Sequence, residues 1–378
     1  MNRQIPLTTT AFYVRSRGLA LVELMIALVL GLVIIGAATG IMLSGIQGFR
    51  TTQGLSQVQD SARVGFELLA RDIRQAGNIP CGNDIPIVNV LNSAQGDPDD
   101  VPWQYDFNNA FIGFEGNTDL EGIPDTGAGS QISGTESLVM LSGAASDVYV
   151  SDYPINNNGA SFTIDTASGG PSGLADGEIL MICNENQATI FQMTQSGNGG
   201  NNGNNGNNGG GSGENVVVNT GGTWSPGNCS KGLGPVIPGN NASQPCDVNG
   251  NPGPFDKNAV IASLSSVAWY VGDNGRADEG GRSLYMARLG TSAGDAALRV
   301  IEIASGVTDL SFRFRLIDTA DFVDASTITA ANRWADVNAV EVSMSLLSQD
   351  QNISTSAADD GRLGRSFTSV VAIRSRSL

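Results

Sequence analysis

The chain contains no histidine and only two lysines, Lys231 and Lys257. Without histidine there is no Ser-His-Asp or Cys-His nucleophile pair and no histidine-ligated metal site. The four cysteines form no C-x-x-C pair, which argues against zinc or redox chemistry. The small-residue stretches carry no phosphate-loop lysine. We therefore expect a protein that is not an enzyme, with no catalytic residues, no metal and no cofactor.

Basic residues are scarce overall, because 20 Lys and Arg stand against 37 Asp and Glu and leave a net charge of -17. Such a surface repels nucleic acid and anionic lipid headgroups, so we expect no nucleic-acid partner. Three of the few basic residues, Arg3, Arg15 and Arg17, lie within residues 1–18, which contain no acid. Removal of that segment would make the net charge -20.

A long apolar run covers residues 19–43 and contains one acidic residue, Glu23. At ~1.5 Å per residue a helix of this length spans a bilayer. An ordinary secretory signal has an apolar core of only roughly 7–15 residues, followed by a small-residue cleavage site. The basic residues before the run predict that residues 1–18 stay in the cytoplasm and that the rest of the chain after the helix lies across the membrane. A plain signal anchor is the alternative.

Glu23 is the most informative residue of the chain. A carboxylate inside a membrane helix costs roughly 2.5–3.5 kcal/mol unless a cation meets it. A cut between Gly18 and Leu19 would create such a cation, the α-amino group of Leu19. The order Arg17, Gly18, Leu19 and, four positions later, Glu23, all at the start of a long apolar helix, resembles the class III signal of type IV prepilins.

This resemblance implies that a membrane prepilin peptidase cleaves after Gly18 and methylates the new N-terminus at Leu19. It also implies that Glu23 pairs with the terminal amine of a neighbouring subunit during filament assembly. Leu19 and Ala20 depart from the residues that are usual at the first two mature positions of the family.

Segments further along the chain are similar to the PilW family of minor type IV pilins. They cover residues 71–77 with Cys81, 307–313, 334–345 and 364–374. The resemblance implies an inner-membrane protein of a Gram-negative bacterium with a periplasmic head. With other minor and major pilins it would prime type IV pilus assembly, stay at the pilus tip, and serve twitching motility and attachment. A minor pseudopilin of a type II secretion system and a pilus-associated adhesin are the alternatives.

A helical stripe continues beyond the apolar run, with apolar residues spaced by three and four. It consists of Leu55, Val58, Ala62, Phe66, Leu69 and Ile73. The opposite face is polar, and Glu67 and Arg71 are spaced for an i,i+4 ion pair. Gly77 fits a C-cap and Pro80 prevents continuation. The sequence predicts one helix of nearly sixty residues, with a membrane and assembly half at 19–44 and an amphipathic half at 45–78.

Gly36, Gly40 and Ser44 form a small-residue face in the membrane half. This spacing either forms a face for close helix packing or arises by chance from the composition of the segment.

The sequence pattern of residues 79–378 predicts a β-rich head. Short β-type runs cover 137–141, 147–150, 178–183, 188–193, 216–219, 266–271, 283–289, 299–304, 309–317, 337–347 and 367–373. Apolar residues alternate at 310–316 and 340–346, as in half-buried antiparallel strands. We expect an α+β fold: a pilin-like lollipop whose long N-terminal helix packs on a large antiparallel sheet. Residues 142–145 are expected to form a turn, and the Asn/Gly tract 197–213 a disordered loop.

The four cysteines are an even set in a chain predicted to be exported, where disulfides form. Three pairings are possible. Cys229 and Cys246 bracket a Gly/Pro/Asn-rich loop and form the natural local bridge, which leaves Cys81 to pair with Cys183.

Two acidic segments are candidate metal-binding sites. The segment that begins at Asp247 starts like a calcium loop, but Pro252 replaces the required Gly and Asn258 the required Glu. Asp273, Asp278 and Glu279 could hold a hard cation, although a solvated acidic turn is the interpretation that we favour.

Overall fold

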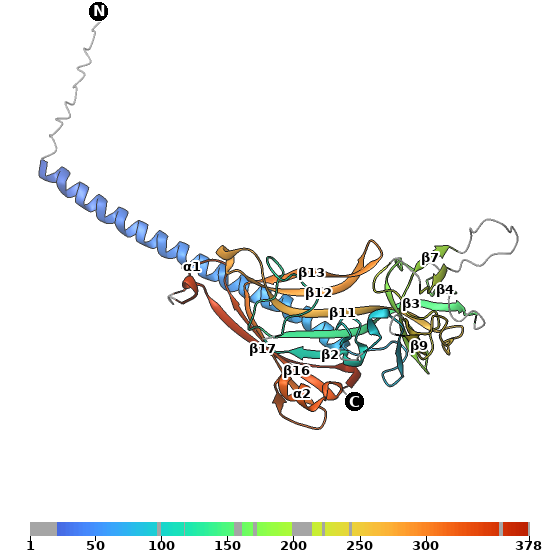
Figure 1. Ribbon diagram of the computed structural model, residues 1–378. Helices are drawn as coiled ribbons and strands as arrows, with labels where there is room; N and C mark the ends of the chain where they lie inside the picture. The colour runs from blue at the N-terminus through green and yellow to red at the C-terminus, as the bar shows by residue number, and fades with distance from the viewer. Residues whose placement is uncertain are drawn as a thin grey trace, which may run out of the picture. The chain divides into compact units, whose positions relative to one another are not determined.

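The computed structural model describes residues 21–96, 100–116, 118–154, 161–168, 172–198, 214–220, 224–241, 244–354 and 358–376. The chain divides into two units, Met1–Gln53 and Gly54–Leu378, and helix α1 (Leu21–Gln75) runs through the boundary (Figure 1). The predicted cleavage site, Gly18 and Leu19, lies outside the described residues. So do residues 199–213 of the Asn/Gly tract, whereas its first two residues belong to strand β7 (Gln195–Asn198).

Helix α1 confirms the predicted stripe in its second half. Its buried residues are Gly54, Val58, Ala62, Gly65, Leu69, Ala70 and Ile73. The helix ends at Gln75, and Gly77 follows with the left-handed φ of +68° that a C-cap glycine supplies. The predicted Glu67–Arg71 pair is wrong. Glu67 instead accepts from Arg63 at 2.9 Å, because it has an arginine one turn away on either side and Arg71 lies beside Asp72.

Two long antiparallel strands, β3 (Ser137–Asp152) and β11 (Val260–Asp273), form the centre of an 11-stranded sheet (Figure 1). The others are β1 (Ile87–Asn89), β2 (Phe111–Phe114), β4 (Ser161–Thr166), β5 (Ile179–Cys183), β6 (Ala188–Gln192), β7, β8 (Glu214–Val217), β12 (Arg282–Ser292) and β13 (Asp295–Ser305). Each central strand changes partner along its length. β3 pairs first with β2 and then with β4, and β11 pairs first with β5 and then with β12.

A second sheet of four strands has the order β15-β14-β16-β17. These are β14 (Val307–Leu316), β15 (Phe322–Val323), β16 (Val337–Leu347) and β17 (Gly364–Ala372), with helix α2 (Ala325–Ala331) between β15 and β16. A two-stranded ribbon consists of β9 (Pro238–Asn241) and β10 (Gln244–Cys246). The short 3-10 helices are η1 (Asn92–Ala94), η3 (Phe107–Asn109), η5 (Ala277–Glu279), η6 (Trp334–Asp336), η7 (Ala358–Gly361) and η8 (Arg374–Arg376).

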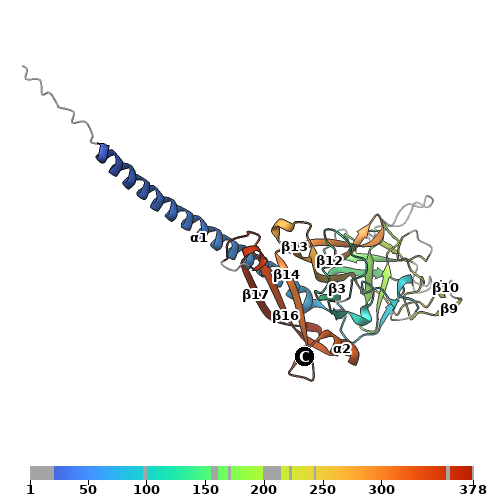
Figure 2. The ribbon, with the colours of Figure 1, turned by 60° about the vertical axis from the view of Figure 1, so that its left-hand side comes forward.

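Residues 54–75 of α1 pack against both large sheets within the second unit (Figure 2). A Cβ atom added at Gly65 would lie 3.0 Å from Leu284 of β12 and 3.2 Å from Met344 of β16. The predicted alternation is confirmed, because Leu310, Phe312, Phe314 and Leu316 are all buried in this core, as are Val340, Val342, Met344 and Leu346. The head is thus mostly antiparallel. One pair departs from the prediction, since β1 runs parallel to β6.

The turn predicted at residues 142–145 is wrong, because these residues lie within β3, whose register with β11 shifts between Ala144 and Val148. Packing leaves no room for a side chain at Gly143, because a Cβ atom there would lie 2.7 Å from Pro80 Cδ and 3.4 Å from the sulfur of Met181. The lack of a side chain at Gly143 therefore lets Pro80, in the segment after α1, lie close to the sheet. Strands β1, β2, β4, β7, β9, β10 and β15 lacked a recognised sequence signal. For residues 197 and 198 the predicted disordered loop is wrong, because they pair with β8 as the end of β7.

The cysteines pair as Cys81–Cys183 and Cys229–Cys246, the arrangement expected from the sequence. The first bridge ties the segment after α1 to the end of β5, and the second joins the loop that precedes β9 to the end of β10.

Removal of the Cys81–Cys183 bridge is expected to destabilise the head more than removal of the other. The bridges close loops of 102 and 17 residues. Loop-closure entropy then predicts costs of about 4.7 and about 3 kcal/mol. Denaturant unfolding of the two Cys→Ser double variants of the full chain measures both. A larger loss for the Cys229–Cys246 variant would contradict this ranking.

Candidate functional site: the exposed apolar segment of helix α1

The first part of α1, residues 21–53, exposes its apolar side chains on every face. From Leu21 to Arg50 every residue except Gly31 is exposed, and Leu21, Leu32 and Ile41 each expose about three quarters of their surface. Burial of one such side chain is worth roughly 1.5–3 kcal/mol, so exposure of the whole set to water is strongly unfavourable. A helix that is apolar all round is a membrane span or is surrounded by other helices.

α1 is long and apolar enough to cross a membrane. Its most apolar 18-residue window has a mean hydropathy of 2.7 and is not buried within the molecule. Thr39 is compatible with lipid, because its hydroxyl donates to the carbonyl oxygens of Ile35 and Gly36 within the helix. Internal pairing of this kind is what a hydrocarbon environment requires.

Glu23 lies in the first turn of α1, where a carboxylate interacts favourably with the helix dipole. Its side chain is exposed and makes no hydrogen bond or ion pair with any residue that the structure describes. Gly36 and Gly40 lie on an open face, since a Cβ atom added at either would meet nothing within 4 Å. Among the described residues, the side chain of Glu23 thus has no partner and the glycine face of Gly36 and Gly40 has no neighbour.

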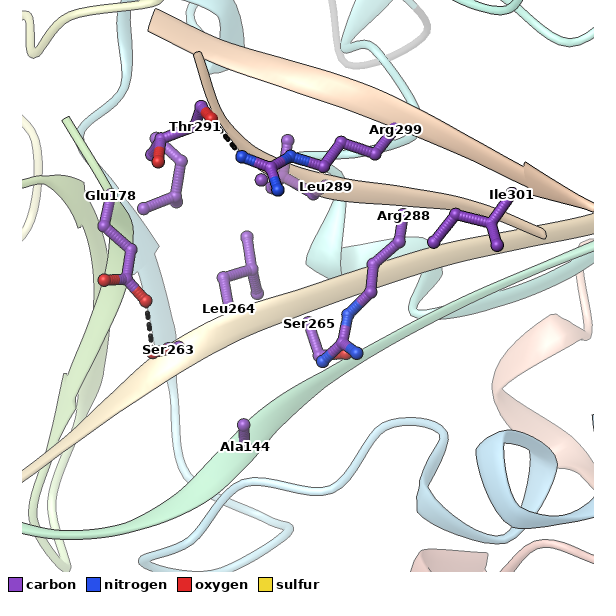
Figure 3. A pocket seen from close by; sticks show the side chains of 12 residues that line it. Ala144, Glu178, Ser263, Leu264, Ser265, Arg288, Leu289, Thr291, Arg299 and Ile301 are labelled. Atoms are coloured by element: carbon purple, nitrogen blue, oxygen red, sulfur yellow. Dashed lines mark hydrogen bonds between the residues drawn. The ribbon is translucent and has the colours of Figure 1, made fainter. Parts of the chain in front are cut away.

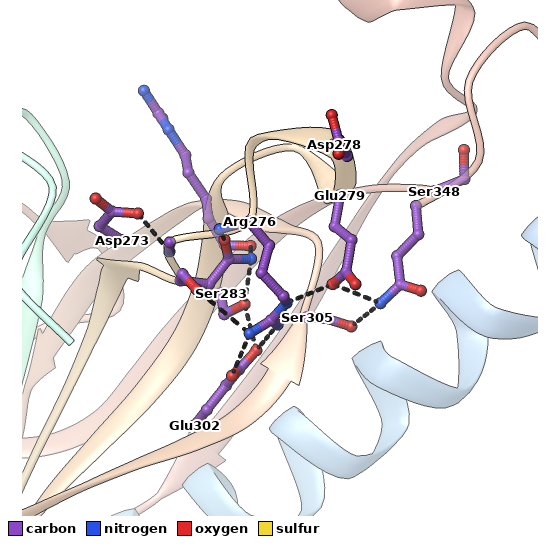
Figure 4. A network of polar contacts seen from close by, with 12 residues as sticks. Asp273, Arg276, Asp278, Glu279, Ser283, Glu302, Ser305 and Ser348 are labelled. Carbon is purple, nitrogen blue, oxygen red and sulfur yellow. Dashed lines mark hydrogen bonds and ion pairs between the residues drawn. The ribbon is translucent and has the colours of Figure 1, made fainter. Parts of the chain in front are cut away.

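The acidic turn at 273–281 is a hydrogen-bonded structural network, shown in Figure 4. Arg276 binds the carboxylates of Glu279, at 2.6 Å, and of Glu302. The hydrogen bond from Arg276 holds the pKa of Glu302 below its usual range. Asp273 accepts from the backbone N–H of Gly275 at 2.7 Å, which shapes the turn.

Two further residues complete this network. Gln349 donates to Ser305 at 2.7 Å and to Glu279. Arg362 is buried and donates to carbonyl oxygens on both sides of it, those of Asp278, Ser348 and Gln349. Sequence reasoning missed both residues because their partners lie far away along the chain.

The segment at Asp247 is likewise a turn, because its carboxylate accepts from the N–H groups of Asn249 and Gly250. Among the described residues no group of three or more Cys, Asp or Glu side chains forms a candidate metal cluster.

Asp72, on α1, makes a long-range contact that the sequence pattern did not suggest. It accepts a 2.9 Å hydrogen bond from the indole N–H of Trp269, 197 positions away and fully buried in β11. Burial raises the pKa of Asp72, although the Trp269 bond and the charges of Arg288 and Arg71 oppose this. The contact fixes the end of α1 on the sheet.

Glu136→Gln is expected to stabilise the head at neutral pH. Burial, together with repulsion from Asp309, Asp324 and Glu115, raises the pKa of Glu136, whose carboxylate accepts from the N–H of Phe312 at 2.7 Å. A raised folded-state pKa means that the favourable contribution is present at acidic pH and is lost as pH rises through that pKa. Glutamine keeps the acceptor and removes the charge.

Thermal unfolding at pH 7 and at pH 4 measures this effect. The advantage of Glu136→Gln over the natural chain should shrink on acidification. The exposed Glu121→Gln serves as control and should give no such pH-dependent gain. A constant difference at both pH values would contradict the assignment.

No protein-family model matches this chain, and comparison with curated proteins finds no significant match.

Proposed function

We propose that this protein is a minor pilin of the PilW type, processed by a prepilin peptidase, which helps to prime assembly of a type IV pilus. One observation carries the proposal. Residues 21–46 of helix α1 are apolar on every face, with a single carboxylate, Glu23, in its first turn. In the sequence this helix directly follows a basic segment that ends in Arg17 and Gly18.

A pilin needs a helix that fits two environments in turn. Before assembly the helix lies in lipid, and after assembly it lies among the helices of neighbouring subunits. An all-round apolar surface with small residues such as Gly36 and Gly40 suits both, because helices associate in lipid through close backbone approach.

The proposed role of Glu23 follows from the lack of a partner for its carboxylate among the described residues. In lipid the carboxylate costs roughly 2.5–3.5 kcal/mol, and a cation from an adjacent subunit would remove that cost. The α-amino group of Leu19, created by cleavage after Gly18, is the proposed partner. Such a pair favours entry into the filament over remaining alone in the membrane.

The proposed location is the inner membrane, with the head in the periplasm until assembly and at the pilus tip afterwards. Arg3, Arg15 and Arg17 favour retention of the leader in the cytoplasm. The two disulfides suit an oxidising compartment on the other side. The head itself is proposed to act structurally, through contacts with other pilins.

The test is the number of pili on cells that lack this chain, with restoration by the natural gene. The proposal predicts few or no pili and loss of twitching motility. Normal piliation together with defective protein secretion would contradict it and favour a pseudopilin. Normal piliation with lost attachment would likewise contradict it and favour an adhesin.

A further inference from the structure

The large sheet forks beside strand β11. On one side β11 pairs with β3 along most of its length; on the other it pairs with β5 through residues 260–263 and with β12 through residues 267–273. Residues 264–266 therefore have no strand partner on the second side. A cavity of about 570 Å³ opens at this fork (Figure 3). Its size is that of a pocket for a small ligand or a short peptide.

Two arginines that are cross-strand neighbours line one wall of the cavity. Arg288 of β12 pairs in register with Arg299 of β13, and both side chains are exposed. Like charges that face each other across strands are destabilising. Neither guanidinium forms an ion pair with a carboxylate among the described residues, in a chain with nearly twice as many acids as bases. The two arginines thus form a cationic site without a direct ion pair, although the charge of Arg288 also acts on Asp72.

Contacts within the head position the side chain of Arg299 before any ligand binds. Its Nη2 donates to the carbonyl oxygen of Thr291 at 2.8 Å, and its side chain runs across Gly290. A Cβ atom at Gly290 would lie only 3.2 Å from Nε of Arg299. Because a guanidinium has five N–H donors and one is used here, the others are available to a ligand.

The opposite wall of the cavity carries a negative charge. Glu178 lies across from the two arginines in Figure 3, where it accepts from the hydroxyl of Ser263; it also accepts from the N–H of Ala175 at 3.0 Å. Leu264 and Ile301 supply apolar surface between the two ends. Glu178 disfavours a polyanion that would fill the whole cavity. The lining selects a ligand with a carboxylate at one end only.

We propose that this fork binds an acidic peptide segment of a partner protein. A Glu or Asp side chain of the peptide would bridge Arg288 and Arg299, with the charge-assisted geometry that arginine offers to carboxylates. The peptide main chain would hydrogen-bond to residues 264–266, which lack a strand partner on this side. The site belongs to the head alone, so its test is separate from that of filament assembly.

The test uses the full-length protein in detergent and a fluorescein-labelled peptide, Gly-Ser-Glu-Val-Glu-Ser-Gly, followed by fluorescence anisotropy. A matched peptide with Gln in place of Glu should bind at least about tenfold more weakly. Arg288→Gln and Arg299→Gln should each weaken binding of the Glu peptide about tenfold. Arg74→Gln removes an equal charge from an exposed site on α1 and should leave binding unchanged.

Gly290→Ala separates a built site from simple charge attraction. It retains every charge but displaces Arg299, so it should weaken binding severalfold while the thermal midpoint stays close to that of the natural chain. No binding of the Glu peptide, equal binding of the two peptides, or an equal loss with Arg74→Gln would overturn the proposal. Binding of free glutarate as tight as that of the peptide would overturn the peptide as occupant.

Discussion

Leu69→Asp is expected to unfold or aggregate the head. Leu69 is fully buried in the core where the second half of α1 meets both large sheets. The change removes a large apolar side chain, worth roughly 2–5 kcal/mol, and places an unpaired charge in its position. A combined loss above about 4 kcal/mol is a large part of the stability of an ordinary domain.

The neighbouring leucine provides a matched control. Leu68 exposes 36% of its surface, whereas Leu69 exposes none. Leu68→Asp should therefore leave the thermal midpoint nearly unchanged. Circular dichroism of both variants in detergent measures the difference. If Leu69→Asp melted like Leu68→Asp, the packing of this helix face in the core would be wrong.

Glu23→Ala is expected to leave membrane insertion intact and to impair pilus priming. The substitution removes a charge from an apolar helix, so insertion becomes easier. The carboxylate has no partner among the described residues, so its loss should not destabilise the monomer. Only the proposed contact between subunits is removed. Because minor pilins are present in few copies, the expected result is a marked reduction in pili.

Membrane fractionation and pilus counts in the same strains measure the two effects separately. Glu67→Ala is the control, since it removes a carboxylate from the exposed face of the second half of α1. It should change neither quantity. Normal piliation with Glu23→Ala would rule out the charge-pairing role of Glu23 in this subunit.

The sequence predicted the features that repeat locally. The stripe from Val58 to Ile73 was readable because a helix returns to the same face every three to four residues. The alternation in β14 and β16 was readable because successive side chains of a strand point to opposite faces. The helix end at Gln75 followed from the conformation that Gly77 permits.

Contacts between distant segments carried no such local signal. Gly143 resembled a turn residue because nothing in the sequence shows that Pro80 and Met181 pack against it. The opposed pair Arg288 and Arg299 appears only once the register of β12 and β13 is known. No sequence pattern marked Asp72, because its indole partner Trp269 lies 197 positions away. Long-range register, rather than composition, decides these sites.

The most direct test of the central claim is the intact mass and N-terminal sequence of the protein extracted from membranes. The account predicts a chain that begins at Leu19 and carries one added methyl group on its α-amine. A chain that begins beyond residue 36 would indicate an ordinary secretory signal, and a chain that retains residues 1–18 would indicate a plain anchor. Either result would contradict the assignment as a pilin.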